Sequence, residues 1–201
     1  KVQWTMSAYL LGFAIGQLFY GPLSDKFGRK PVLMLGFSIF LFATVTSGFS
    51  TSIEMLTLAR AVQGLGGACP QILSRAMVRD MYEGHHAGRQ LSVMSTIMGL
   101  APILSPLTGG FLAIWFGWRS AFVLMFIVAA GLTVTAALLL PETLRERQSG
   151  PMSPAAILKS FAIVARSRVW VTYAIILGCC HIGLFTFIST SPFVLRNIYK
   201  L

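Results

Sequence analysis

The sequence predicts an all-α protein embedded in a membrane, and three observations support this fold class. Of the 201 residues, 55% are hydrophobic and only 11% are charged, with a mean hydropathy of +0.74, whereas a soluble domain carries about 25% charged residues. Long apolar runs recur, each close to the ~20 residues that a helix needs to cross a ~30 Å hydrocarbon layer. No run keeps the alternation of a transmembrane strand, so a barrel is not expected.

Six membrane-spanning helices are expected in chain order. The first follows Lys1 almost directly and ends before a charged connection, and the second begins after it. The third carries polar side chains, the fourth contains two prolines, and the fifth and sixth flank the longest polar interval. Their expected ranges are 4–23, 32–50, 54–76, 91–115, 120–140 and 169–191. Because the chain starts without methionine and enters a span at once, we expect a fragment of a longer protein.

Basic residues gather in alternate connections, and this pattern predicts the topology. Those on one side are Lys26, Arg29, Lys30, Arg75, Arg79, Arg89, Arg145, Arg147, Lys159, Arg166 and Arg168. Those on the other side are Lys1, Arg119, Arg196 and Lys200. The positive-inside rule makes the richer side cytoplasmic. The net charge of +10 therefore indicates a lipid bilayer rather than nucleic acid, since no basic stripe with interleaved aromatic residues lies outside these loops.

The third span contains Arg60, Gln63, Gln71 and Ser74 on broadly one helical face, together with Gly64 and Gly67. Burying an arginine in a membrane costs at least about 2.5 kcal/mol on insertion scales, so Arg60 should face a wet cavity or a partner. A role in function is the first hypothesis. The alternative is a structural arginine that caps carbonyls or pairs with another helix.

The fourth span contains Pro102 and Pro106, four residues apart in "APILSPLTGG". Neither proline can donate a hydrogen bond to the carbonyl four residues earlier, so we expect this helix to kink or loosen there. Gly109 and Gly110 would permit the close approach of a neighbouring helix. A bent helix with a smooth contact face suits a moving element, although structural kinks are also common.

The sequence predicts no metal site, no cofactor and no enzymatic activity. Cys69, Cys179 and Cys180 fall inside spans, where small packing residues are expected. Cys-Cys-His at 179–181 lacks metal-ligand spacing, because successive side chains splay around a helix axis. No nucleophile has a convincing base or metal partner.

The connection "GPLSDKFGRKPVL", residues 21–33, joins the first two spans. Gly28 permits a tight turn, and its basic residues can hold the turn at the cytoplasmic face. That topology signal leaves Asp25 unexplained, because positive-inside charge requires no acid. At the end of a helix, the Asp25 carboxylate could meet Arg29, other basic residues or the positive N-terminus of another helix.

These motifs together resemble the major facilitator superfamily, specifically its drug/proton antiporter branch. The loop signature "GxLaDrxGrk" is matched by Gly21, Leu23, Asp25, Lys26, Gly28, Arg29 and Lys30. The arginine signature of the fourth helix is matched by Arg60, Gln63, Gly64 and Gly67. Residues 101–110 resemble the antiporter signature "GxxxGPxxGG", with Ala101 and Ser105 in place of its first two glycines. "SAYLLGFAIGQLFYGP", "MVRDMY" and "PETL" bring the chain nearest to bicyclomycin-resistance-type exporters.

The resemblance implies twelve helices in two six-helix bundles, of which this chain supplies about helices two to seven. Residues 1–140 would be helices two to six of the N-terminal bundle. Residues 141–168, with three prolines, would be a cytoplasmic linker, and 169–201 the first helix of the C-terminal bundle. The remaining helices of the same transporter are the implied partners, and we expect the complete protein to be monomeric.

The resemblance also implies roles for the signature residues. The loop residues around Asp25 would form a conformational latch between the two bundles, and Arg60, Gln63 and Gly64 would serve proton coupling. Pro102, Ser105, Pro106, Gly109 and Gly110 would form the antiporter kink. No acidic residue of this chain lies convincingly in mid-membrane, so the titrating carboxylate is expected outside it.

Helical spacing suggests substrate contacts, although each of these residues could instead pack against a helix or lipid. The candidates are Tyr9, Phe13, Gln17, Met98, Tyr173 and Phe187. The function expected is the export of small amphipathic drugs or metabolites across a bacterial-type inner membrane by proton antiport and alternating access. The alternatives are a facilitator or symporter for a polar nutrient and, in another class, a membrane receptor or scaffold.

Overall fold

The computed structural model describes residues 2–144 and 162–197, without the side chains of residues 2, 3, 103, 184, 185 and 187–197. Within these ranges, the regular structure is entirely helical, which confirms the predicted class. The helices are α1 Val2–Phe27, α2 Arg29–Gly48, α3 Ile53–Met81, α4 Gly84–Phe116, α5 Ser120–Leu139 and α7 Arg168–Asn197. Each predicted span corresponds to one of them. In the described residues, α2, α4 and α5 are long and apolar enough to cross a membrane by length and composition.

The chain divides into two compact units, residues 1–150 and 151–201. The first unit contains α1 to α5 and the second contains α7. Residues 145–161 lie outside the described ranges. The predicted boundaries of the linker at 141 and 168 therefore stay a prediction.

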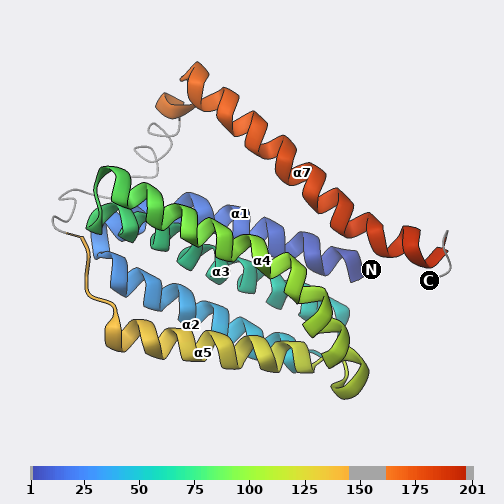
Figure 1. Ribbon diagram of the computed structural model, residues 1–201. Helices are drawn as coiled ribbons and strands as arrows, with labels where there is room; N and C mark the ends of the chain where they lie inside the picture. Colours follow the sequence, from blue (N-terminus) through green and yellow to red (C-terminus); the bar gives the residue numbers. More distant parts are fainter. Residues whose placement is uncertain (1, 145–161, 198–201) are drawn as a thin grey trace. The chain divides into compact units, whose positions relative to one another are not determined.

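Helix α3 lies between α1 and α2 in the first unit, and α2 also packs along α5 (Figure 1). The backbones of α1 and α3 approach so closely that a Cβ atom at Gly64 would overlap the carbonyl oxygen of Tyr9. The buried core follows these three helices, with Tyr20 from α1, Phe37 from α2, and Cys69 and Leu73 from α3. Side chains on α1 and α3 therefore have fixed positions relative to α2.

Helix α4 packs loosely on the rest of the first unit, touching α3 and α5 at few points. It continues through Pro102 and Pro106, and its ribbon bends in the C-terminal half (Figure 1). A Cβ atom at Gly109 or Gly110 would meet no atom within 4 Å. The expected close helix contact at these glycines is therefore not made within the first unit.

Candidate functional site

The turn between α1 and α2 holds a charge cluster, by which we mean Asp25, Arg29, Asp80 and Glu142. Arg29 is its centre and is only 9% exposed. Its Nη1 lies 2.6 Å from Asp25 Oδ1, and its Nε donates to Asp80 Oδ2 at 2.9 Å. Nη1 also donates to Ser24 Oγ at 2.6 Å. A buried guanidinium is thus satisfied by a carboxylate on α1 and a second one near the end of α3.

Glu142 follows α5 and caps the N-terminus of α2. The backbone N–H groups of Arg29 and Lys30 donate to its Oε1 and Oε2 at 2.9 and 3.2 Å. These are the donors that a helix leaves unpaired in its first turn, where the helix dipole also favours an anion. Backbone hydrogen bonds outweigh the effect of burial and hold the pKa of Glu142 below its usual value of 4.5. Lys30 strengthens the same junction, since its Nζ donates to the carbonyl of Ala137 at 2.8 Å.

Gly28 makes this turn possible in two ways. Its φ of 103° lies in a region that residues with a side chain rarely adopt. A Cβ atom here would also come within 2.5 Å of Glu142 Oε2. The loop signature therefore places its glycine where the carboxylate approaches the backbone.

The structure pairs Asp25 with Arg29, which is one of the alternatives that the sequence left open. Lys26 lies over the ring of Phe27, and Gly21 accepts a hydrogen bond from Ser24. Sequence reasoning missed Asp80 and Glu142 as members of the site. Their partner Arg29 lies 51 and 113 residues away in the chain, beyond any local pattern. The only available signals were the strings "MVRDMY" and "PETL", which contain these two acids.

Arg60 occupies a second polar site, inside the bundle. Its Nη1 donates to Gln63 Oε1 at 2.6 Å, and Gln63 Nε2 donates to Thr44 Oγ1 on α2 at 2.7 Å. The guanidinium carbon lies 4.5 Å from the centre of the Tyr9 ring on α1. Gln63 and Thr44 are almost fully buried. Three helices thus fix the orientation of one cation.

No carboxylate forms a salt bridge with Arg60 among residues 2–144 and 162–197. The salt bridges of these ranges belong to Arg29. Gln63 supplies a neutral acceptor, which orients the guanidinium without cancelling its charge. The site can therefore accept an anionic group.

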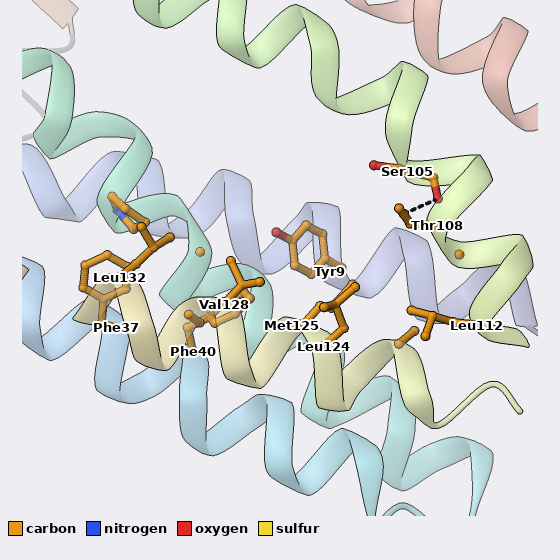
Figure 2. A pocket seen from close by; sticks show the side chains of 15 residues that line it. Tyr9, Phe37, Phe40, Ser105, Thr108, Leu112, Leu124, Met125, Val128 and Leu132 are labelled. Atoms are coloured by element: carbon orange, nitrogen blue, oxygen red, sulfur yellow. Dashed lines mark hydrogen bonds between the residues drawn. The ribbon is translucent and has the colours of Figure 1, made fainter. Parts of the chain in front are cut away.

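Beside Arg60, an apolar cavity of about 450 Å³ opens among α1 to α5 (Figure 2). Tyr9 points toward it from α1, Phe37 and Phe40 line it from α2, and Leu124 and Met125 line it from α5. Ser105 and Gly109 of the predicted kink also belong to its wall. The Tyr9 ring thus connects the cavity with the Arg60 cation.

The other predicted substrate contacts do not gather in this cavity. Phe13 stacks on Tyr9 and packs against the core, while Gln17 is exposed on α1. Met98 is exposed on α4, Tyr173 is exposed on α7 in the second unit, and the side chain of Phe187 lies outside the described residues.

Met98 lines a separate cavity of about 340 Å³ between α3 and α4. Gln71 and Ser74 of α3 and Met94 of α4 also line it. This surface combines thioethers with hydrogen-bonding side chains. Such a surface adapts to molecules of different shape.

A family profile with the description Major Facilitator Superfamily matches residues 1–201. The chain belongs to the major facilitator superfamily. It is accordingly an integral membrane protein with several spans. This membership confirms the family resemblance and the fold class expected from the sequence.

Relatives within the superfamily carry names that refer to drug resistance. Multidrug resistance protein D of Escherichia coli is 38% identical over 142 residues, which make up 71% of this chain and 36% of that protein. The bicyclomycin resistance protein homolog of Haemophilus influenzae is 29% identical over 199 residues, or 99% of this chain and 50% of that protein. The chain spans about half the length of the curated relatives it matches.

A solved structure in the superfamily shows the same fold. The human organic anion transporter MFSD10 (TETRAN) matches with a TM-score of 0.64 and 24% sequence identity. The match covers 82% of this chain and 40% of that one. At this identity, the likeness concerns the fold alone.

Proposed function

We propose that the full-length protein exports small amphipathic drugs or metabolites across a bacterial inner membrane in exchange for protons. The names of the bacterial relatives support the substrate class and the direction. The observation that carries the coupling mechanism is the Arg60 site, where a cation is fixed by Gln63 and Tyr9 without a carboxylate partner in the described residues.

A fixed cation of this kind is suited to proton coupling. A carboxylate brought beside Arg60 would be stabilised in its ionised form, and its pKa would rise when the two groups separate. We infer that this carboxylate belongs to a helix outside the present chain. Alternating access would then couple its protonation to the release of substrate.

The substrate surface of this proposal is the cavity between α3 and α4. Met94 and Met98 would contact apolar parts of a drug, and Gln71 and Ser74 would contact its polar groups. The larger cavity in Figure 2 would be filled by a further helix of the same protein, since an apolar space beside a loosely packed helix suits an apolar helix.

The test is drug-dependent proton movement in liposomes that contain the full-length protein. We expect drug addition to release protons in the wild type, and Arg60→Gln to lose this response by at least tenfold while drug binding persists. Arg60→Lys keeps the charge but loses the fixed guanidinium, so it should retain part of the response.

Arg79→Gln is the matched control, because Arg79 is an exposed arginine of the same helix that donates to the carbonyl of Arg75. It should behave as the wild type. Drug transport without proton movement in the wild type would overturn the coupling mechanism and favour a facilitator. Proton release that persists in Arg60→Gln would show that Arg60 is not part of the coupling mechanism.

A further inference from the structure

A cationic junction joins α2 and α5 at the end of the bundle opposite to the charge cluster. Arg119 Nε donates to the carbonyl of Gly48 at 3.1 Å, and its Nη2 donates to the carbonyl of Ser50 at 3.1 Å. These bonds satisfy carbonyl groups at the C-terminal end of α2. The guanidinium carbon lies 4.3 Å from the centre of the Trp118 ring. Arg119 is thus held in place, yet its side chain remains exposed.

The same junction favours a negatively charged ligand. Arg119 is the N-cap residue of α5, where its side chain makes no capping hydrogen bond, and the first turn of α5 contains no acidic residue. A helix N-terminus favours an anion, and here a cation adds to that effect. Within the described residues, the salt bridges do not include Arg119, and its hydrogen bonds to Gly48 and Ser50 do not use Nη1.

An apolar groove of about 430 Å³ begins at Arg119 and lies between α2 and α5. Its wall consists of Thr44, Val45, Gly48, Phe49, Phe122, Val123 and Phe126. It lies on a different face of α5 from the cavity in Figure 2, which Leu124, Met125 and Val128 line. Val45, Phe49 and Val123 are all exposed, so this face of the unit is open to its surroundings.

We propose that this groove binds a phospholipid, with the phosphate on Arg119 and an acyl chain along α2 and α5. Arg119 supplies a donor and a charge for the phosphate, and the aromatic and branched side chains supply an apolar wall. Trp118 beside Arg119 is typical of the level at which headgroups lie. A free phosphate would leave the apolar groove unused, and a neutral apolar molecule would leave the cation unused.

The test is phosphatidylglycerol binding to the full-length protein in detergent, followed by native mass spectrometry and by melting temperature. We expect saturable retention and a higher melting temperature for the wild type. Arg119→Gln should weaken retention by about tenfold, because the charge is lost while hydrogen bonding to α2 remains possible. Val123→Trp should weaken it similarly by filling the groove with Arg119 intact.

Val134→Trp is the control, since Val134 is 57% exposed on α5 against 59% for Val123 and does not line the groove. It should bind as the wild type does.

Equal binding by wild type, Arg119→Gln and Val123→Trp would overturn the proposal. If inorganic phosphate stabilises the protein as much as phosphatidylglycerol does, the proposal that an acyl chain lies in the groove is wrong. If diacylglycerol stabilises it as much, the proposal that Arg119 binds the phosphate is wrong. If Arg119→Gln fails to fold, the comparison of Val123→Trp with Val134→Trp tests the proposal by itself.

Discussion

Glu142 shows how one carboxylate can cap the N-terminus of a helix that is distant in the sequence. The first turn of α2 has no acidic residue of its own, and its N-cap is a glycine without a side chain. Glu142, 113 residues from Arg29, supplies the missing acceptor. The pKa of its carboxyl is lower in the folded protein than in the unfolded chain. The stabilisation is therefore complete above the usual glutamate pKa and is lost as the pH falls through the lowered value.

We accordingly expect the stability of the Glu142→Gln variant to fall less steeply than that of the wild type as the pH is lowered. At pH 7 the variant should be less stable by at most about 1 kcal/mol, because the carboxylate is largely exposed and screened by solvent. Such a change corresponds to roughly 2–4 °C in melting temperature for a protein of this size. The wild type and the variant should converge as the pH falls below 4.5.

The measurement is the melting temperature in detergent from pH 3.5 to 7, with Glu83→Gln as the control. Glu83 is an exposed acid before α4 that makes no side-chain cap, so its variant should follow the wild type. A constant difference between Glu142→Gln and the wild type at every pH would contradict the ionic origin of the effect.

The position of α3 depends on the contact of its backbone with α1. A side chain at Gly64 would collide with the carbonyl of Tyr9, and backbone cannot move aside as a flexible side chain can. Gly64→Leu should therefore destabilise the protein by more than the ~1–3 kcal/mol of ordinary overpacking. Gly131→Leu on α5 should be tolerated, since nothing lies within 4 Å of its Cβ position.

Size-exclusion chromatography and thermal melting in detergent would measure this difference. Gly64→Leu should lose the monodisperse peak or melt well below the wild type. Equal behaviour of the two leucine variants would mean that α1 and α3 are not in close contact.

Helices were predictable from the sequence because the membrane requires apolar runs of a fixed length. Their ends were less predictable, since a helix can continue after it leaves the lipid. The third span was expected to end at residue 76, but α3 continues to Met81. Arg79 and Asp80 lower the hydropathy without breaking the helix, and Asp80 then reaches Arg29. Hydropathy reports where lipid contact ends and says little about hydrogen bonding beyond it.

In both polar sites the arginine was easier to predict from the sequence than its partners. Arg60 stood out because charges are rare among apolar residues, and Arg29 stood out as part of the loop signature. Thr44 did not, since a hydroxyl in an apolar run usually bonds to its own helix, as Thr44 also does with Phe40. Its second role, as the acceptor for Gln63, depends on the packing of α2 against α3. Such pairings depend on tertiary structure, which no local pattern encodes.

The arrangement of the two polar sites predicts that they serve different steps of transport. The charge cluster joins α1, α2, α3 and α5 at the end of the bundle that we expect to face the cytoplasm, whereas Arg60 lies within the bundle beside Tyr9. A change in the cluster should therefore alter the rate of the conformational step and leave drug binding intact. Asp25→Asn and Asp80→Asn each remove one of the two charges that hold Arg29. We expect each to slow transport about tenfold, equivalent to about 1.4 kcal/mol in the barrier.

Initial rates of drug transport in liposomes, together with equilibrium drug binding, would test this division in the full-length protein. Both variants should transport slowly and bind drug with an unchanged Kd, and Glu83→Gln, which removes an exposed acid, should match the wild type in both measurements. Arg60→Gln should instead lose proton release at normal drug affinity. A parallel loss of drug affinity in Asp25→Asn or Asp80→Asn would mean that the cluster shapes the binding site itself.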